Sequence, residues 1–189
     1  MPRIEAPTVA EHHVLRRTAI VDAAAGLLGS DGPAAVTPAA VASSAGLARS
    51  SVYQYFASSG ALLAVAVEEL FARSTALVGA AVAQARTPAA QIEAFVDAAL
   101  GAALDGHLPV AQYSGPELPE PCRVRVVELH AELVRPLVEA LRATGAEDVV
   151  GVAGLVMGVM VAAAGQVRRG EPAELVRARA RRFVAGAIG

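Results

Sequence analysis

The segment 49–56 carries side chains that could read the base edges of DNA. Val52 and Phe56 are four residues apart, so on a helix they share one face and can point inward. The polar residues that would then point outward are Arg49, Ser50, Tyr53 and Gln54. Arginine suits guanine or phosphate, glutamine suits adenine, and tyrosine and serine suit phosphate oxygens. From composition alone, an ordinary solvated helix with a half-buried aromatic patch explains the segment equally well.

The residues before this segment predict how it is held. Thr37 is a good helix N-cap, and Pro38 behind it favours the first helical position. The short helix that begins there is expected to end at 45–46, and the next helix begins at Arg49 after a turn that contains glycine. Two short helices joined in this way form a helix-turn-helix. A longer helix over 16–28, with apolar residues at helical spacing, is expected to precede them.

The rest of the chain predicts helices throughout, so the expected fold class is all-α. The expected ranges are 59–86, 88–105, 123–142 and 149–167, with a last helix from 172 onward. The segment 106–121 is crowded with glycine and proline and is predicted to be a loop. The predicted domains are 1–58 and 59–189.

Composition limits the function classes. Hydrophobic residues make up 54% of the chain and charged residues 18%, against roughly 45–50% and 25% in average domains, so a sizeable core is expected. The single cysteine, Cys122, excludes an intrachain disulfide and a thiolate metal cluster. The first 13 residues lack an apolar run of the secretory kind, which predicts a cytoplasmic protein by default.

No catalytic residue, cofactor or metal site is predicted. His107, Cys122 and His130 could be imagined as an enzyme site. However, no nucleophile turn, carboxylate–histidine spacing or phosphate loop orders them. The sequence therefore predicts a protein that is not an enzyme.

The segment 149–167 contains 19 residues without a charge, which is long enough to cross a membrane. Its small residues recur at helical steps, as Gly151, Gly154, Gly158 and Ala162. A stripe of small side chains lets another helix approach closely, in a membrane or in a soluble bundle. We favour a buried or dimer-forming helix; the alternative is a membrane-anchored helical protein that uses 149–167 as its span.

Residues 16–70 resemble the DNA-binding region of the tetracycline-repressor (TetR) family. The resemblance rests on LLGSDG at the end of the first helix, on TPAAVASSAGL over 37–47 and on SVYQYFASSGALL over 51–63. It implies a three-helix helix-turn-helix domain followed by a helical domain for effector binding and dimerisation. It also implies a dimeric, ligand-responsive transcriptional regulator, most often a repressor. Such a dimer binds a palindromic operator on double-stranded DNA.

By position, the resemblance also implies residue roles. Thr37 would cap the second helix and touch a phosphate, and Tyr55 would lie on the DNA backbone. The residues facing the major groove would be Arg49, Ser50, Tyr53 and Gln54. The family usually has a lysine shortly after the aromatic pair, where this chain has Ser59. Since residues 1–60 hold four arginines and four acidic residues, DNA affinity should fall less steeply with salt than for a basic domain.

A small-molecule pocket among the middle helices is a further implication of the resemblance. His130 lies opposite the charged residues of the predicted helix 123–142, on a stripe with Val127, Val134, Leu137 and Leu141. A histidine there either bonds a carbonyl in the core or fixes a polar group of a ligand. Other candidate lining residues, each of which also suits a plain core, are Phe71, Phe95, Met157 and Met160, with His107 and Tyr113 at the entrance. Such pockets are mostly apolar, so a hydrophobic or amphipathic effector is expected.

The last two helices are predicted to form the dimer interface. The stripe of small residues in 149–167 would let another helix come close, and the last helix offers Val176, Ala180 and Phe183 on one face. Two such helices from each subunit would make a four-helix bundle. That bundle would bury 19 uncharged residues without lipid, so no membrane partner is expected.

Overall fold

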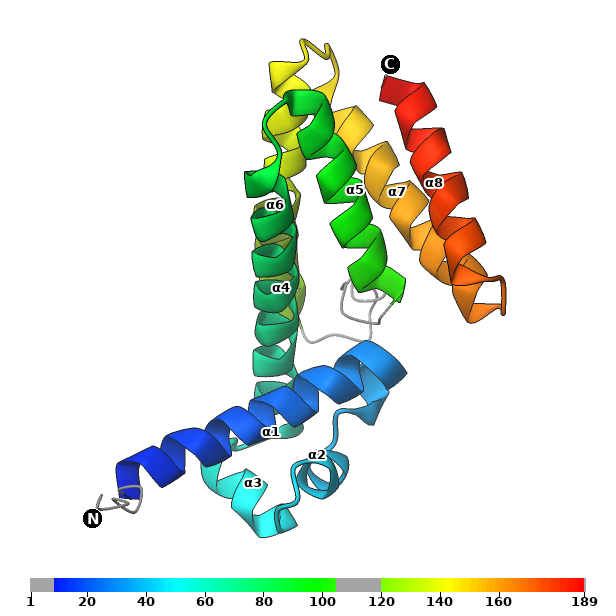
Figure 1. Ribbon diagram of the computed structural model, residues 1–189. Helices are drawn as coiled ribbons and strands as arrows, with labels where there is room; N and C mark the ends of the chain where they lie inside the picture. Colours follow the sequence, from blue (N-terminus) through cyan, green and yellow to red (C-terminus); the bar gives the residue numbers. More distant parts are fainter. Residues whose placement is uncertain (1–8, 105–119, 189) are drawn as a thin grey trace, which may run out of the picture. The chain divides into compact units, whose positions relative to one another are not determined.

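The computed structural model describes residues 9–104 and 120–188, which are helical in nearly their whole length (Figure 1). Within these ranges there is no strand, which confirms the predicted all-α class. The elements are α1 (Val9–Asp31), η1 (Pro33–Ala35), α2 (Pro38–Ser44), α3 (Arg49–Tyr55), α4 (Ser59–Gln84), α5 (Pro88–Leu104), α6 (Glu120–Ala143), α7 (Val149–Arg168) and α8 (Ala173–Ile188). Of the predicted loop 106–121, residues 120–121 are described, and they open α6.

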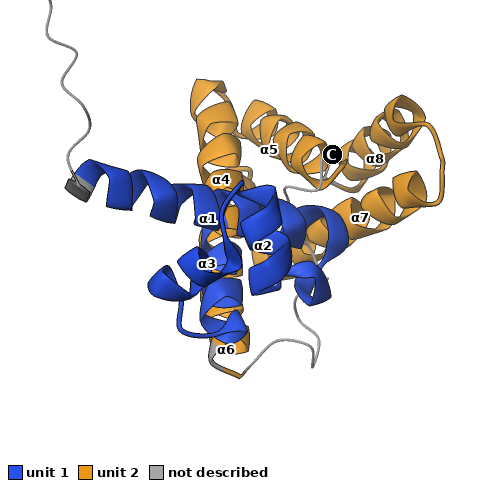
Figure 2. Cartoon of the chain, turned by 90° about the horizontal axis from the view of Figure 1, so that it is seen from below, with its two compact units in different colours: residues 1–69 blue, residues 70–189 orange. Residues whose placement is uncertain are grey.

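The chain divides into two compact units, residues 1–69 and residues 70–189 (Figure 2). The division falls inside α4, whereas the predicted domain boundary after residue 58 marks the start of that helix. Unit 1 holds α1 to α3 and the beginning of α4, and unit 2 holds the remaining helices. The boundary after residue 58 stays a prediction.

Unit 1 is built on the apolar face of α1. Ile20, Ala24 and Leu28 follow one another at four-residue steps, and all three are fully buried. α1 contacts η1 and α2, and α2 contacts α3. The helix begins at Val9, earlier than the predicted start, and residues 11–18 are exposed. The exposed first half is therefore an extension of a helix whose second half is packed. Extending an existing helix is favourable because each added residue gains a hydrogen bond and no new helix has to be nucleated.

Side-chain caps determine where several helices begin. Thr37 and Thr87 each precede a proline, and each hydroxyl accepts a hydrogen bond from the backbone N–H three residues further on, at 3.2 Å in both cases. Ser58 caps α4 in the same manner at 3.1 Å, and Asp148 caps α7 at 3.0 Å. These oxygens satisfy N–H groups that have no partner inside the helix.

Unit 2 is organised around α5, which contacts α6, α7 and α8. Phe95, Ala99 and Leu100 of α5 are fully buried. α7 also contacts α6 and α8, and it buries Ala153, Val156, Met157, Met160, Ala163 and Ala164. The apolar character of α7 is thus explained on this face by packing within the same chain.

The buried face of α6 differs from the predicted one. Val127 is 70% exposed and His130 is half-buried, whereas Val126, Leu129 and Leu133 are buried. Val134, Leu137 and Leu141 of the predicted stripe are buried. The prediction was wrong at Val127 because it took the face opposite the charged residues. The chain has valine at both 126 and 127, so the pattern allowed two registers there.

Candidate nucleic-acid interface

The turn between α2 and α3 is fixed by local backbone geometry. Gly46 has a φ of +65°, in the left-handed region that glycine enters without steric penalty. The N–H of Leu47 donates to the carbonyl of Ala42 at 2.8 Å, which closes the end of α2. Val41 of α2 and Val52 of α3 are fully buried. The two helices are therefore held together by a tight turn and by apolar residues on their inner faces.

The outer face of α3 presents the four polar residues that the sequence placed there. All four side chains are exposed: Arg49, Ser50, Tyr53 and Gln54. Val52 and Phe56 are buried, as their four-residue spacing predicts. Because the inner residues are anchored, the outer ones are presented together on one turn-and-a-half of helix. Their contact with DNA stays a prediction.

Two residues on this face contact one another. Nη2 of Arg49 donates to the phenolic oxygen of Tyr53 at 3.2 Å. The Arg49 Cζ atom also lies 5.7 Å from the centre of the Tyr53 ring, within range of a cation–π interaction. These contacts orient the guanidinium along the helix, where it can still turn its remaining N–H groups outward.

Two residues of α1 support the end of α3, and the sequence patterns did not single them out for this task. The ring of His13 lies 4.6 Å from that of Tyr55, and the guanidinium of Arg17 lies 5.5 Å from the ring of Phe56. Tyr55 is half-buried. The only signal in the sequence was the four-residue step from His13 to Arg17, which places both on one face of α1.

The residues predicted to line an effector pocket fall into three groups. Phe71, Phe95, Met157 and Met160 are buried in unit 2. His130 is half-buried, and burial lowers its pKa from the ordinary value. His107 and Tyr113 lie outside the described residues. The pocket itself stays a prediction.

The residues predicted for the dimer interface differ in their burial. Gly154, Gly158, Ala162 and Phe183 are exposed, whereas Val176 and Ala180 are buried. Because α8 contacts α7 and α5 of its own chain, Val176 and Ala180 belong to the core of the subunit, which corrects their placement on an outer face. The exposed members remain candidates for an interface.

Gly151 has a local role that the stripe of small residues did not suggest. A Cβ atom at this position would collide with the carboxylate of Asp148. That carboxylate accepts the hydrogen bond from the N–H of Gly151 that caps α7. A side chain at Gly151 would therefore require the Asp148 carboxylate to shift. A groove of about 230 Å³ lies further along, between α7 and α8, with Ala162 and Phe183 in its lining.

Within the described ranges, α7 is the one helix that is long and apolar enough to cross a membrane by length and composition. Buried core helices of soluble proteins meet the same criterion. α7 contacts three other helices of unit 2, so length and composition give only weak support for a membrane span.

Comparisons with known proteins agree with this geometry. Residues 20–66 match the family model described as bacterial regulatory proteins, tetR family. No curated protein sequence is similar to this chain beyond the level expected by chance. Among solved structures, a TetR-family transcriptional regulator from Streptomyces coelicolor is similar over 97% of this chain and 96% of its own, with a TM-score of 0.75 and 17% identity.

Two further solved structures share the arrangement of helices. The fatty acid degradation regulator FadR from Bacillus halodurans has a TM-score of 0.73 and 16% identity, covering 90% of this chain and 95% of its own. FadR from Bacillus subtilis, solved in complex with stearoyl-CoA, has a TM-score of 0.71 and 14% identity, covering 88% and 96%. At these identities the likeness concerns the fold, while the match over 20–66 concerns the sequence of the helix-turn-helix itself. The sequence of residues 20–66 thus matches the tetR family of bacterial regulatory proteins, and the whole chain shares the fold of a solved TetR-family regulator.

Proposed function

We propose that this protein is a ligand-responsive transcriptional repressor that binds a palindromic operator as a homodimer. The observation that carries the proposal is the outer face of α3, where four exposed polar side chains stand on a helix anchored by buried Val52 and Phe56. Arginine and glutamine can each bond a purine base through two hydrogen bonds. Tyrosine and serine beside them supply donors for phosphate oxygens.

We expect a dimer because α3, the helix proposed to contact the bases, is short. One seven-residue helix reads only a few base pairs, so tight binding needs a second copy in a neighbouring major groove, about 34–36 Å away or slightly more. The exposed residues of α7 offer a surface for this contact, since Leu155 is 74% exposed beside Gly154 and Gly158. Phe183 of α8 is 63% exposed and adds a large apolar side chain.

The effector is proposed to be hydrophobic or amphipathic. Unit 2 buries Phe71, Phe95, Met157 and Met160, and His130 adds a polar group at the margin of this core. The Bacillus subtilis FadR structure with stearoyl-CoA shows that a protein of this fold can hold a long apolar chain with a polar head. An effector that binds among these helices would release the protein from DNA by favouring a conformation with lower operator affinity.

Footprinting of the purified protein on the DNA upstream of its own gene tests the proposal. A protected palindrome is expected, and it should disappear with the double variant Arg49→Ala, Gln54→Ala. Arg142→Gln, at an exposed position on α6 of unit 2, removes one charge far along the chain from α3 and should keep the footprint. A reporter behind the protected site should be expressed more strongly when the gene is deleted. Protection that is indifferent to the double variant, or expression that falls on deletion, would contradict the proposal.

A further inference from the structure

A groove between α5 and α8 in unit 2 has the dimensions of a small-molecule site. Its volume is about 460 Å³, within the range of about 300–1,000 Å³ that is typical of ligand pockets. Ile92, Val96 and Val184 give it an apolar floor, and these three residues are buried. Charged side chains from both helices stand at its edge. The groove therefore combines an apolar surface with a polar rim, as amphipathic ligands require.

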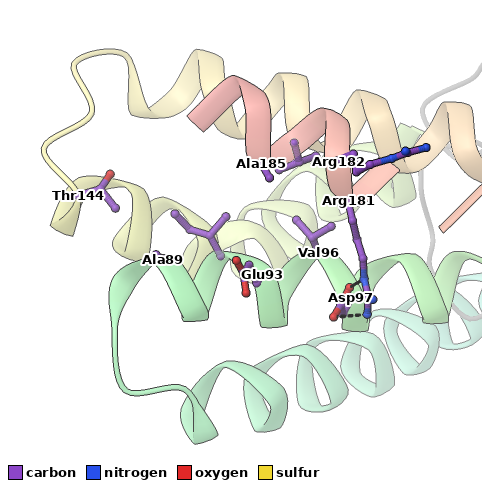
Figure 3. Close-up of a pocket in the computed structure, with 10 residues that line it drawn as sticks. Ala89, Glu93, Val96, Asp97, Thr144, Arg181, Arg182 and Ala185 are labelled. Carbon is purple, nitrogen blue, oxygen red and sulfur yellow. Dashed lines mark hydrogen bonds and ion pairs between the residues drawn. The ribbon is translucent and has the colours of Figure 1, made fainter. Parts of the chain in front are cut away.

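An ion pair with two hydrogen bonds lies at the edge of this groove. Figure 3 shows Arg181 reaching from α8 to Asp97 on α5. Nε donates to Oδ1 and Nη2 donates to Oδ2, so the guanidinium holds the carboxylate with both oxygens. The two side chains are 52% and 39% exposed, and a pair in contact with water contributes little to stability. The ion pair between Arg181 and Asp97 can therefore be broken with little loss of free energy.

Arg182, the next residue, also lines the groove (Figure 3). Within the described part of the chain it has no ion pair or side-chain hydrogen bond, and it is exposed. The two arginines are consecutive on α8, so their side chains leave the helix in different directions, and Figure 3 shows only Arg181 turned toward Asp97. Arg182 adds a positive charge to the lining of the groove.

We propose that this groove binds an amphipathic organic carboxylate whose head replaces Asp97 on Arg181 and whose hydrocarbon tail covers the floor. Asp97 presents to Arg181 the same planar group, in the same two-point geometry, that such a ligand would present. The displaced Asp97 side chain lies at the surface, where water can solvate it. The tail would lie against Ile92, Val96 and Val184, and its own apolar surface would be removed from water.

The acidic residues of α5 decide where the head can lie. Glu93 is exposed one turn before Asp97 and also lines the groove, so it repels an anion on the α5 side and favours a head placed against α8. The opposite occupant, an amphipathic cation, would instead bind Glu93 and Asp97. The two occupants respond in opposite directions when Asp97 loses its charge, which makes them separable.

Methyl NMR of the full chain can observe this groove directly. The sequence has only four isoleucines, Ile4, Ile20, Ile92 and Ile188. Ile92 lines the groove, whereas Ile20 is buried in unit 1 and serves as an internal control. The Ile92 signal is assigned by its loss in Ile92→Val. Octanoate should shift this signal in a saturable manner, while octan-1-ol and octylammonium at equal concentration should leave it in place.

Variants then test the roles of the side chains. Arg181→Gln should weaken octanoate binding by about two- to fivefold, since it removes a charge-assisted pair that is partly exposed to water. Asp97→Asn should tighten binding, because the internal competitor loses its charge. Ala185→Leu, at an exposed position in the lining, should fill the groove and abolish the shift. Arg179→Gln is the matched control: it removes an α8 arginine that pairs with Glu171, away from this groove, and should bind as the wild type does.

Three outcomes would overturn the proposal. The first is an Ile92 signal that octanoate leaves unmoved at millimolar concentration. The second is an equal or larger shift with octylammonium, lost in Asp97→Asn, which would assign the groove to cations. The third is an octanoate shift that survives both Arg181→Gln and Ala185→Leu, which would place the ligand elsewhere in unit 2. An unchanged Ile20 signal in each variant shows that unit 1 has kept its fold.

Discussion

Arg49 is held against Tyr53 on the outer face of α3, by a hydrogen bond of 3.2 Å and by its position over the aromatic ring. The two residues are four apart, so their contact lies along a single turn of helix. An arginine that is already oriented loses less conformational freedom when it binds DNA. If α3 binds DNA as proposed, Tyr53 would act both by its own hydroxyl and by the direction it gives to Arg49.

Arg49→Ala is expected to weaken operator binding by about 1–3 kcal/mol if the arginine reads a guanine through two hydrogen bonds. Tyr53→Phe keeps the ring under the guanidinium and removes only the hydroxyl, so its effect should be smaller. Gel-shift titration on the operator measures both. A Tyr53→Phe loss larger than that of Arg49→Ala would mean that the hydroxyl itself makes the main contact.

Gln54→Ala should change base preference as well as affinity, because an exposed glutamine on this face can bond adenine through two hydrogen bonds. Selection of preferred sequences from a random pool, for variant and wild type in parallel, measures this. Ser43→Ala on α2 is a control, since Ser43 is exposed in the same unit but outside the outer face of α3. Unchanged base preference in Gln54→Ala would remove this residue from the base-reading set.

Thr37→Ala and Thr87→Ala form a matched pair, because both remove a Thr-Pro cap with the same 3.2 Å hydrogen bond. Each should lower the free energy of unfolding by about 1 kcal/mol, within the usual 0.5–2 kcal/mol for a cap. Only Thr37→Ala should also weaken DNA binding, since the resemblance gives Thr37 a phosphate contact. Chemical denaturation and gel shift on the same samples measure the two effects. Equal losses of DNA affinity in both variants would reduce Thr37 to a structural cap.

Gly158→Leu is expected to shift the protein toward monomer and to abolish tight operator binding. A Cβ at Gly158 meets nothing within 4 Å in the isolated chain, so the position is open at its Cβ and the added bulk is expected to act mainly on a partner. Overpacking costs about 1–3 kcal/mol per site, and a two-fold axis counts it twice. Sedimentation measures the oligomer. Gly79→Leu on α4, where a Cβ is equally unopposed, is the control, and a fully dimeric Gly158→Leu protein would exclude this face from the interface.

His130 predicts a loss of stability on the acid side. Burial lowers its pKa from 6.5, so the unfolded chain binds the proton more readily than the folded chain. The free energy of unfolding should therefore fall as the pH drops below about 6.5, and level off once the folded form is also protonated. His130→Gln should remove this part of the pH dependence, as measured by denaturation between pH 5 and 8. The exposed His12→Gln variant controls for the loss of a histidine as such.

The same His130 variant tests the proposed effector role. Ligand-induced release from DNA should change more than operator affinity in the absence of ligand. An intact ligand response together with a large fall in stability would assign His130 to the core alone.

Local signals predicted most of the fold. The caps at Thr37 and Thr87, and the turn at Gly46, each depend on residues within a few positions of one another. The inner and outer faces of α3 were also predictable, because Val52 and Phe56 fix the register of so short a helix. The contact between Arg49 and Tyr53 follows from the same four-residue spacing.

Contacts between residues far apart in the sequence could not be predicted from such local signals. Arg181 and Asp97 are 84 positions apart, and no periodicity joins them. The buried face of α6 was misjudged at Val127 because apolar residues on adjacent positions suit either of two registers. Val176 and Ala180 were predicted to lie in the dimer interface because a helix pattern marks an apolar face but does not show whether the same subunit or a partner covers it.

The first half of α1 can unfold locally while the rest of unit 1 stays folded. Val14 and Leu15 are 63% and 60% exposed, so unwinding the turns around them uncovers almost no apolar surface. Such a segment opens at far smaller free energy than the global transition, and its amide hydrogens should exchange long before those near Ile20. Yet His13, inside this segment, lies against Tyr55 at the end of α3. If Tyr55 contacts the operator as proposed, binding would also favour the helical state of the first half of α1, and amide protection at residues 11–18 should rise when DNA is bound.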